Sequence, residues 1–271
     1  MDRQLIVTRP AAEGVEWVSA LNQAGIPALQ LPLIEIRSLA EAPTLHLSWL
    51  QSAPSSALMF VSPAAVRQCF ALTLPDGGLG GWLGRGRSRV WLTGPGSASE
   101  LLRYGVPEQR VDMPAADADE FDSEALWRVV FSQVAASFRL LIVRGRDVPG
   151  GQQGRPWLAD QVRRAGAEVC EDVVYERLQP DWGQAQNEQA RRFCLDGSIW
   201  LFSSSQAVNN LLGLLPGQDW TRARAVATHR RIAATARQAG FGVVVESRPK
   251  LEAVIASIKS SDEFGESPAT A

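Results

Sequence analysis

Two stretches of the chain read FVSPAAV at residues 60–66 and FSSSQAV at residues 202–208, and they align with each other without a gap. Each one contains the end of a short apolar run, then small residues with hydroxyl side chains, and then the start of a segment with helical spacing. Short apolar runs alternate with helical segments throughout the chain, a pattern typical of parallel β-sheets covered by helices. The sequence therefore predicts an α/β fold in which parallel sheets are flanked by helices.

The expected strands are short apolar runs, at residues 5–7, 58–61, 90–92, 140–143, 199–202, 226–227 and 243–245. The clearest helical segments between them are 12–24, 97–104 and 232–239. These segments stop at Gly25, Gly105 and Gly240. Because glycine tolerates the left-handed backbone that commonly ends a helix, each of these glycines predicts a helix C terminus.

Further matches follow in the same order along the two halves of the chain. Residues 5–7 match 141–143, Ala24-Gly25 matches Ala165-Gly166, and residues 123–126 match 251–254. In addition, Thr93, Ala98 and Gly105 have the same spacing as Thr228, Ala233 and Gly240. Chance similarity between generic βα units is the alternative for any single match, but the ordered set favours duplication. The sequence therefore predicts two similar domains.

Residues 32–37 and 173–178 interrupt the alternation at corresponding places in the two halves. Both segments have the extended, alternating pattern of a strand, so they can pair as a two-stranded connector between the domains. The alternative is that each is an edge strand of its own sheet.

The composition sets limits on the class of protein. The 271 residues suffice for two modest domains, and 45% hydrophobic with 21% charged residues is typical of a globular chain. A net charge of −2 offers no global field for nucleic acid or anionic lipid. Cys69, Cys170 and Cys194 are an odd number without C-x-x-C spacing, so we expect reduced core thiols rather than disulfides or a zinc knuckle.

Several expectations concern location and assembly. The apolar run at residues 5–8 is too short for a signal peptide, and no run approaches the roughly 18 apolar residues of a membrane helix. The sequence therefore predicts a cytoplasmic protein that binds neither membrane nor nucleic acid. We expect a monomer, with a disordered tail at residues 260–271, which are rich in Ser, Glu and Pro.

The usual catalytic motifs are missing from the sequence. With His46 and His229 as the two histidines, a His-rich metal site is excluded, and we expect no metal and no cofactor. The glycine-rich stretch 77–84 misses the G-x-G-x-x-G pattern by one residue and is predicted to be a loop. No Walker lysine follows a glycine-rich turn, which argues against nucleotide hydrolysis.

Small hydroxyl residues follow the predicted strands, just before helices. Ligands of open α/β sheets bind at this edge, where free N–H groups and the positive ends of helix dipoles favour anions. Capping of the helices is the alternative role for each of these residues. Three arginines at strand ends or helix starts add positive charge, although a solvated role is an equal alternative for each. The candidate binding residues are Arg9, Ser62, Ser97, Arg144, Ser203, Ser204, Ser205, His229 and Arg231.

At these residues the sequence resembles the uroporphyrinogen-III synthase family, from about Gln4 to Ile258. The segments that carry the resemblance are 5–10, 31–34, 122–126, 143–145, 165–169, 174–177 and 228–233. The sequence departs from the usual pattern at Ser97, where many relatives have threonine, and at Arg230, where proline is usual.

The resemblance implies a discontinuous architecture. Domain 1 combines residues 1–36 with 177–258, and domain 2 spans 42–172. Residues 37–41 and 173–176 then form the hinge connector, and the site lies in the cleft that this connector spans.

The resemblance also implies the reaction and the partners. The substrate is hydroxymethylbilane, a small linear tetrapyrrole with eight carboxylates, which loses water and closes through a spiro intermediate that inverts ring D. The implied activity is that of a cyclising lyase without a cofactor. A transient contact with the upstream bilane-forming enzyme is a further expectation.

Tyr175 is the candidate catalytic residue, because a phenol in the connector can donate a proton without carrying charge. Strand alternation predicts that its ring lies on the face opposite Val174 and Glu176. A packed connector tyrosine is the alternative. Two other functions stay open: a non-catalytic tetrapyrrole-binding or regulatory module of the same fold, and a nucleotide-sugar or dinucleotide enzyme built around residues 94–96.

Overall fold

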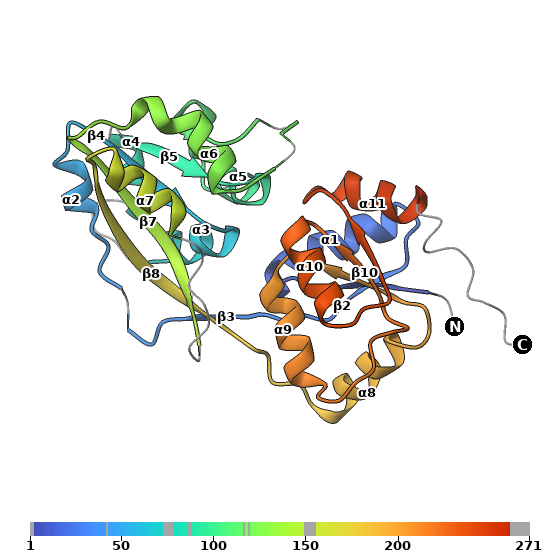
Figure 1. Cartoon of the computed structure of the whole chain (residues 1–271). Helices are drawn as coiled ribbons and strands as arrows, with labels where there is room; N and C mark the ends of the chain where they lie inside the picture. Colours follow the sequence, from blue (N-terminus) through green and yellow to red (C-terminus); the bar gives the residue numbers. More distant parts are fainter. Residues whose placement is uncertain are drawn as a thin grey trace, which may run out of the picture. The chain divides into compact units, whose positions relative to one another are not determined.

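The computed structural model divides the chain into two compact units (Figure 1). Unit 1 comprises Met1–Glu35 and Gln179–Ala271, and unit 2 comprises Ile36–Leu178. The expected tail at 261–271 lies outside the residues that the structure describes, whereas Ser260 ends a helix. The described residues are 3–41, 43–72, 78–85, 88–115, 117–118, 120–148 and 156–260.

Unit 1 contains a five-stranded sheet in the order β11-β10-β9-β1-β2, and all of its strand pairs are parallel. The strands are β1 (Leu5–Val7), β2 (Ala28–Gln30), β9 (Ile199–Phe202), β10 (Arg224–Ala227) and β11 (Val243–Glu246). The helices are α1 (Ala11–Gln23), α8 (Gln184–Phe193), α9 (Ser205–Leu214), α10 (Arg230–Gln238) and α11 (Leu251–Ser260). Strands β1 and β9 are fully buried, as strands covered on both faces are.

Unit 2 contains a six-stranded sheet in the order β3-β8-β7-β4-β5-β6. The strands are β3 (Glu35–Ser38), β4 (Ser55–Phe60), β5 (Arg89–Leu92), β6 (Val111–Asp112), β7 (Phe138–Asp147) and β8 (Glu168–Leu178). The helices are α2 (Leu47–Gln51), α3 (Pro63–Phe70), α4 (Gly78–Arg85), α5 (Pro95–Leu102), α6 (Ser123–Val130) and α7 (Trp157–Arg164), with short 3₁₀ turns at Glu108–Arg110 and Phe131–Gln133. The pairs from β8 through β7, β4 and β5 to β6 are parallel.

The two sheets repeat the same spatial order. The sequence repeat matches β1 to β7, β9 to β4 and β10 to β5, and the order β10-β9-β1 of unit 1 corresponds to β5-β4-β7 of unit 2. Beside β1 lies β2 in unit 1, as β8 lies beside β7 in unit 2. On the other side, β11 lies beside β10 in unit 1, as β6 lies beside β5 in unit 2. The prediction of an α/β fold with two similar halves is confirmed.

The two predicted connector strands are neighbours in space. Strand β3 lies beside β8 as the edge strand of the six-stranded sheet. Strand β8 runs without a break from Glu168 to Leu178, so residues 173–176 continue a strand of unit 2 and do not form a separate element.

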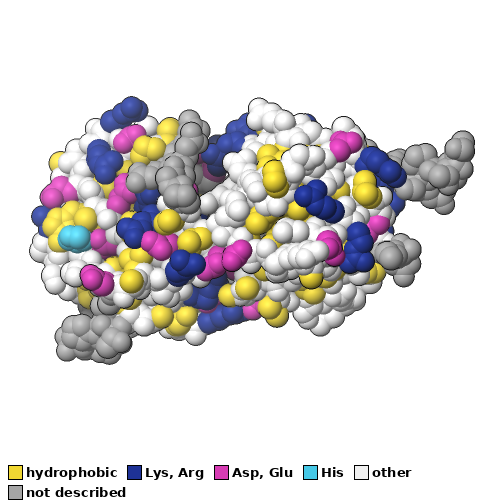
Figure 2. Space-filling model, turned by 90° about the horizontal axis from the view of Figure 1, so that it is seen from below, with side chains coloured by type: hydrophobic (Ala, Val, Ile, Leu, Met, Phe, Trp, Pro, Cys, Tyr) yellow, Lys and Arg dark blue, Asp and Glu magenta, His cyan; other side chains and the backbone are white. Residues whose placement is uncertain are grey.

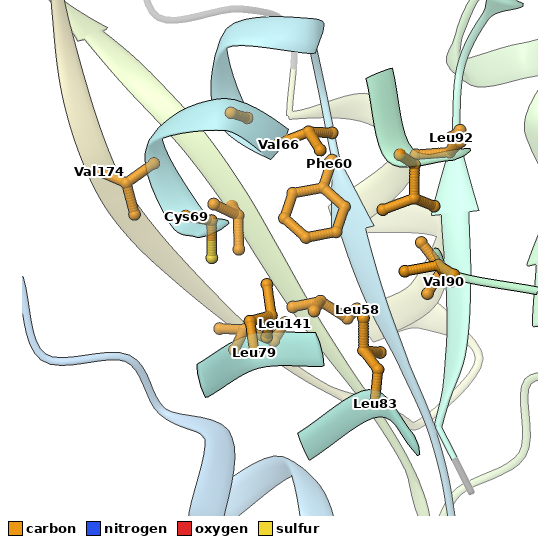
Figure 3. Close-up of a cluster of buried hydrophobic side chains, with 14 of the residues drawn as sticks. Leu58, Phe60, Val66, Cys69, Leu79, Leu83, Val90, Leu92, Leu141 and Val174 are labelled. Carbon is orange, nitrogen blue, oxygen red and sulfur yellow. The ribbon is translucent and has the colours of Figure 1, made fainter. Parts of the chain in front are cut away.

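The core of unit 2 explains an element that the sequence did not predict. Leu58, Phe60, Leu141 and others from the sheet pack against side chains of α3 and α4 (Figure 3). The glycine-rich stretch was expected to be a loop, but residues 78–85 form α4. Leu79, Leu83 and the intervening Trp82 are buried in this core, because their helical spacing places them on one face.

The predicted helix ends are confirmed at three glycines. Gly25, Gly105 and Gly240 have φ angles of +77°, +72° and +93°. They follow α1, α5 and α10 within a few residues, and a side chain at these positions would strain the left-handed backbone.

The face of the molecule drawn in Figure 2 carries basic and acidic side chains that are intermingled. This face therefore offers no extended patch of one sign, in keeping with the net charge of −2. Among the described helices, none combines the length and the hydropathy that crossing a membrane requires.

Candidate functional site

In unit 1, two candidate residues cap helices at the carboxyl ends of strands. Ser204 follows β9, and its Oγ accepts a hydrogen bond of 3.1 Å from the backbone N of Gln206 at the start of α9. His229 follows β10, and its Nδ1 accepts a 3.1 Å bond from the backbone N of Arg231. Capping, the alternative role, is therefore real for both residues. It uses one free N–H group at each helix start and leaves others for a ligand.

The two serines beside Ser204 have different environments. The Oγ atom of Ser205 lies 3.1 Å from the Oγ1 of Thr235. The Oγ atom of Ser203 is shielded from solvent and has no hydrogen-bond partner among the described residues, and the same holds for Oε1 of Gln206. Buried polar atoms without a partner are costly, so Ser203 and Gln206 mark a place where a water molecule or ligand group would be stabilised. Gln206 was not among the residues predicted from the sequence, although it adjoins the serine run.

Arg9 lies two residues after the end of β1 and is already engaged within unit 1. Its guanidinium lies 4.1 Å from the ring centroid of Trp17 and 3.6 Å from a carboxylate oxygen of Glu13, and its side chain is 14% exposed. Burial lowers the pKa of Arg9, and the charge of Glu13 opposes this shift in part. Arg231, in contrast, lies exposed on the first turn of α10, where it can meet a mobile anion.

In unit 2, the structure brings Ser62 and Tyr175 together. Ser62 follows β4 and caps α3, with its Oγ accepting a 3.0 Å hydrogen bond from the backbone N of Ala65. The hydroxyl of Tyr175 lies 2.9 Å from the same Oγ. Tyr175 is only 2% exposed, whereas Ser62 is half-buried, so Ser62 is the more accessible hydroxyl of the pair.

A β-bulge places Tyr175 in this position. Arg144 pairs with Val173 and Gly145 pairs with Tyr175, so Val174 is the extra residue in the ladder. The predicted alternation is therefore wrong here, because Val174 and Tyr175 both join the same hydrophobic core. A Cβ atom at Gly145 would lie 2.4 Å from the tyrosine ring, so glycine is required for this close approach. A glycine inside a strand is a known signal of a bulge, and it could have pointed to this site.

The remaining candidates of unit 2 lie near the same edge of the sheet. Ser97 is buried in the first turn of α5, a helix that begins after the extended Gly94 with Pro95 as its first residue. Arg144 lies near the end of β7 and donates a 2.8 Å hydrogen bond to Glu171. Its charge is thus partly balanced within unit 2.

Each unit repeats one arrangement at the carboxyl edge of its sheet. Two neighbouring strands each end at the start of a helix, with hydroxyl or imidazole groups in the turn: β4 and β5 before α3 and α5, and β9 and β10 before α9 and α10. Free N–H groups at such helix starts favour carboxylates. The Ser62–Tyr175 pair adds two hydroxyl groups that can donate or accept hydrogen bonds.

Two α/β units with the same strand order, each with helix starts at the carboxyl edge of its sheet, define a class of duplicated α/β proteins. The chain belongs to the uroporphyrinogen-III synthase family, since residues 15–256 match the family described as "Uroporphyrinogen-III synthase HemD".

Individual relatives agree with this membership. The chain is 28% identical over 247 residues to uroporphyrinogen-III synthase of Salmonella typhimurium, a match that covers 88% of this chain and 92% of that protein. It is 27% identical over 248 residues to the Escherichia coli protein of that name, with the same shares covered. Among solved structures, uroporphyrinogen-III synthetase of Helicobacter pylori gives a TM-score of 0.61 at 15% identity and covers 96% of this chain and 99% of that one. A mutant uroporphyrinogen III synthase of Thermus thermophilus gives a TM-score of 0.52 at 15% identity, with 95% and 98% covered.

Proposed function

We propose that the protein converts hydroxymethylbilane into uroporphyrinogen III, with loss of water and inversion of ring D through a spiro intermediate. The match of residues 15–256 to the family carries this proposal. The protein then acts as a cyclising lyase, and its own side chains and backbone supply the groups that bind and orient the substrate.

The edges of the two sheets suit the charge of this substrate. The linear tetrapyrrole carries eight carboxylates, and helix N termini with serine hydroxyls hold such groups without a costly cluster of buried cations. In the proposal, Ser203, Ser204 and Ser205 serve one part of the substrate in unit 1, and Ser62 and Ser97 serve another in unit 2. Arg231 contributes an exposed charge.

The reaction needs little acid–base machinery. Electron-rich pyrroles drive departure of the terminal hydroxyl and formation of the new carbon–carbon bond. The protein therefore chiefly has to hold the two ends of the tetrapyrrole close together and correctly oriented. We assign the Ser62–Tyr175 pair to the departing hydroxyl. Ser62, the more accessible member, donates its proton to that hydroxyl, which leaves as water, and takes a proton from Tyr175 in turn. The phenolate regains a proton when the pyrrole carbon that forms the new bond loses its hydrogen.

The burial of Tyr175 favours a second candidate, a tetrapyrrole-binding module without turnover. Such a module would use the same edges of the sheets but would not release a rearranged product.

One assay separates the two candidates. Freshly generated hydroxymethylbilane is supplied to catalytic amounts of the protein without added metal or nucleotide, and the porphyrin isomers are analysed after oxidation. We expect the type III isomer to replace the type I isomer that forms spontaneously. An unchanged isomer ratio at high protein concentration, together with retained binding of a linear tetrapyrrole, would support the binding module.

A further inference from the structure

Three side chains that commonly bind metals lie together in unit 2, and none of them is assigned to the substrate. One potential ligand atom from each of His46, Cys170 and Asp172 lies within 4.8 Å of the other two. The sequence could not predict this cluster, because His46 and Asp172 are 126 residues apart.

Two elements hold these side chains in place. Cys170 and Asp172 are alternate residues of β8, in a part of the strand without a bulge, so their side chains project from the same face. His46 directly precedes α2. The backbone N of His46 donates a 2.8 Å hydrogen bond to one carboxylate oxygen of Asp172, and its ring Nδ1 lies 2.6 Å from the other.

The charge of Asp172 supports a cation at this place. Asp172 is only 5% exposed, and a buried carboxylate is ordinarily paired with a cation or bound to a metal. Glu171 projects from the opposite face of β8, where it pairs with Arg144 and Arg163. The arginines on that face therefore do not serve Asp172.

We propose that His46, Cys170 and Asp172 bind one Zn²⁺ ion, with water as the fourth ligand. One sulfur, one nitrogen and one oxygen donor suit Zn²⁺, which tolerates this mixture better than Mg²⁺ or Ca²⁺ does. Ligand atoms around tetrahedral zinc are about 3.3–3.7 Å apart. Nδ1 of His46 and Oδ1 of Asp172, which lie 2.6 Å apart, therefore have to separate by roughly 0.7 Å to admit the ion, and a separation at the 4.8 Å limit has to shorten by roughly 1 Å. The His46 side chain is 54% exposed, which gives the ion a path from solvent and a place for the water.

One of the other two cysteines, Cys194, provides a matched control. Cys69 and Cys194 are buried, and burial raises the pKa of each thiol to about 12. Cys194 is buried within unit 1, whereas the three proposed ligands belong to unit 2. Cys194→Ala therefore removes a thiol without touching the proposed ligands.

The test uses the full chain, freed of metal by dialysis against a chelator and then titrated with Co²⁺. Cobalt substitutes for zinc and gives a thiolate-to-metal absorption band in the near ultraviolet when a cysteine binds it. We expect one equivalent of Co²⁺ to produce this band in the wild type and in Cys194→Ala, and Zn²⁺ to abolish the band by displacement. The band should be missing from Cys170→Ala.

A second variant keeps the proposal testable if loss of Cys170 disturbs the strand. His46→Ala changes a side chain that is largely exposed, and we expect its Zn²⁺ affinity, measured by competition with a chromophoric chelator, to fall at least tenfold. Zn²⁺ should also raise the Tm of the wild type and of Cys194→Ala but not that of His46→Ala. No thiolate band in the wild type, or a band that persists in Cys170→Ala, would overturn the proposal. None of these readouts depends on the proposed synthase activity.

Discussion

The hydroxyl of Tyr175 shares one serine oxygen with a helix cap. Ser62 Oγ accepts from the backbone N of Ala65 and lies 2.9 Å from the phenol, so the position of α3 and that of the phenol are linked. The ring itself is fixed by the bulge at Val174 and by its close approach to Gly145. A phenol held in this way is oriented before substrate arrives, which is the condition under which a proton donor is effective.

The variant Tyr175→Phe tests this role, because it keeps the ring against Gly145 and removes only the hydroxyl. We expect turnover to fall roughly 10²-fold. The free energy of unfolding should decrease by only about 0.5–1.5 kcal/mol, because one hydrogen bond is lost. Turnover and thermal unfolding are measured on one preparation. Tyr104, the other tyrosine, gives the control Tyr104→Phe. Turnover of Tyr175→Phe near that of the wild type would remove Tyr175 from the mechanism.

The arginines should differ because their surroundings differ. Arg231→Ala removes an exposed charge, so we expect an unchanged Tm and a loss of about 1.5–3 kcal/mol in kcat/KM if it contacts a carboxylate. Arg9→Ala also removes the contact with Trp17, and we expect it to lower the Tm. We expect Arg144→Ala to lower the Tm less than Arg9→Ala does, because Glu171 loses one of its two arginine partners. Complete inactivation of all three variants with intact folding would show that arginines, rather than helix starts, hold the substrate.

At the scale of elements, the start of α9 combines a cap with a predicted anion site. Ser204→Ala removes the cap and should cost about 0.5–2 kcal/mol of stability. Ser204→Asp keeps a capping oxygen and favours the helix dipole, so its stability should stay near that of the wild type. Its negative charge would, however, repel a substrate carboxylate. We therefore expect kcat/KM to fall by about tenfold or more, which corresponds to at least 1.4 kcal/mol. Activity that follows stability in both variants would assign Ser204 to capping alone.

The sequence predicted most of the strands and three of the helix ends, because apolar runs and terminal glycines are local signals. The repeat predicted two similar domains, and matching segments do occupy matching places in the two sheets, but the order of the strands came from the structure. Helix α4 was missed because glycines at positions 78, 80, 81 and 84 suggested a loop. Burial of Leu79, Trp82 and Leu83 outweighs the low helix propensity of those glycines.

The candidate site was predictable only in part. The hydroxyls at the strand ends could be located from sequence because parallel strands end at a common edge. The contact between Ser62 and Tyr175 could not, because a single bulge changes the face on which every following side chain lies. Long-range pairs such as His46 and Asp172 leave no spacing pattern at all.

At the scale of the whole molecule, each unit has a hydrophobic core of its own. The repeat supplies a matched pair of core residues, Phe60 in unit 2 and Phe202 in unit 1, and both are fully buried. We expect Phe60→Leu and Phe202→Leu each to destabilise the unit that contains it by about 1–3 kcal/mol. Hydrogen exchange followed by peptide should show faster exchange in that unit alone. Equal loss of protection in both units would show that they unfold together.

The discontinuity of unit 1 has a consequence for synthesis of the chain. Strand β1 pairs with β9, so Leu5 meets Ile199 only after almost two hundred further residues have been made. Unit 2 is continuous from Ile36 to Leu178 and is complete on the ribosome before β9 has emerged. Until then the nascent segment β1-α1-β2 exposes apolar strands and an unpaired sheet edge. We expect this segment to be the part of the nascent chain that depends most on binding by a chaperone.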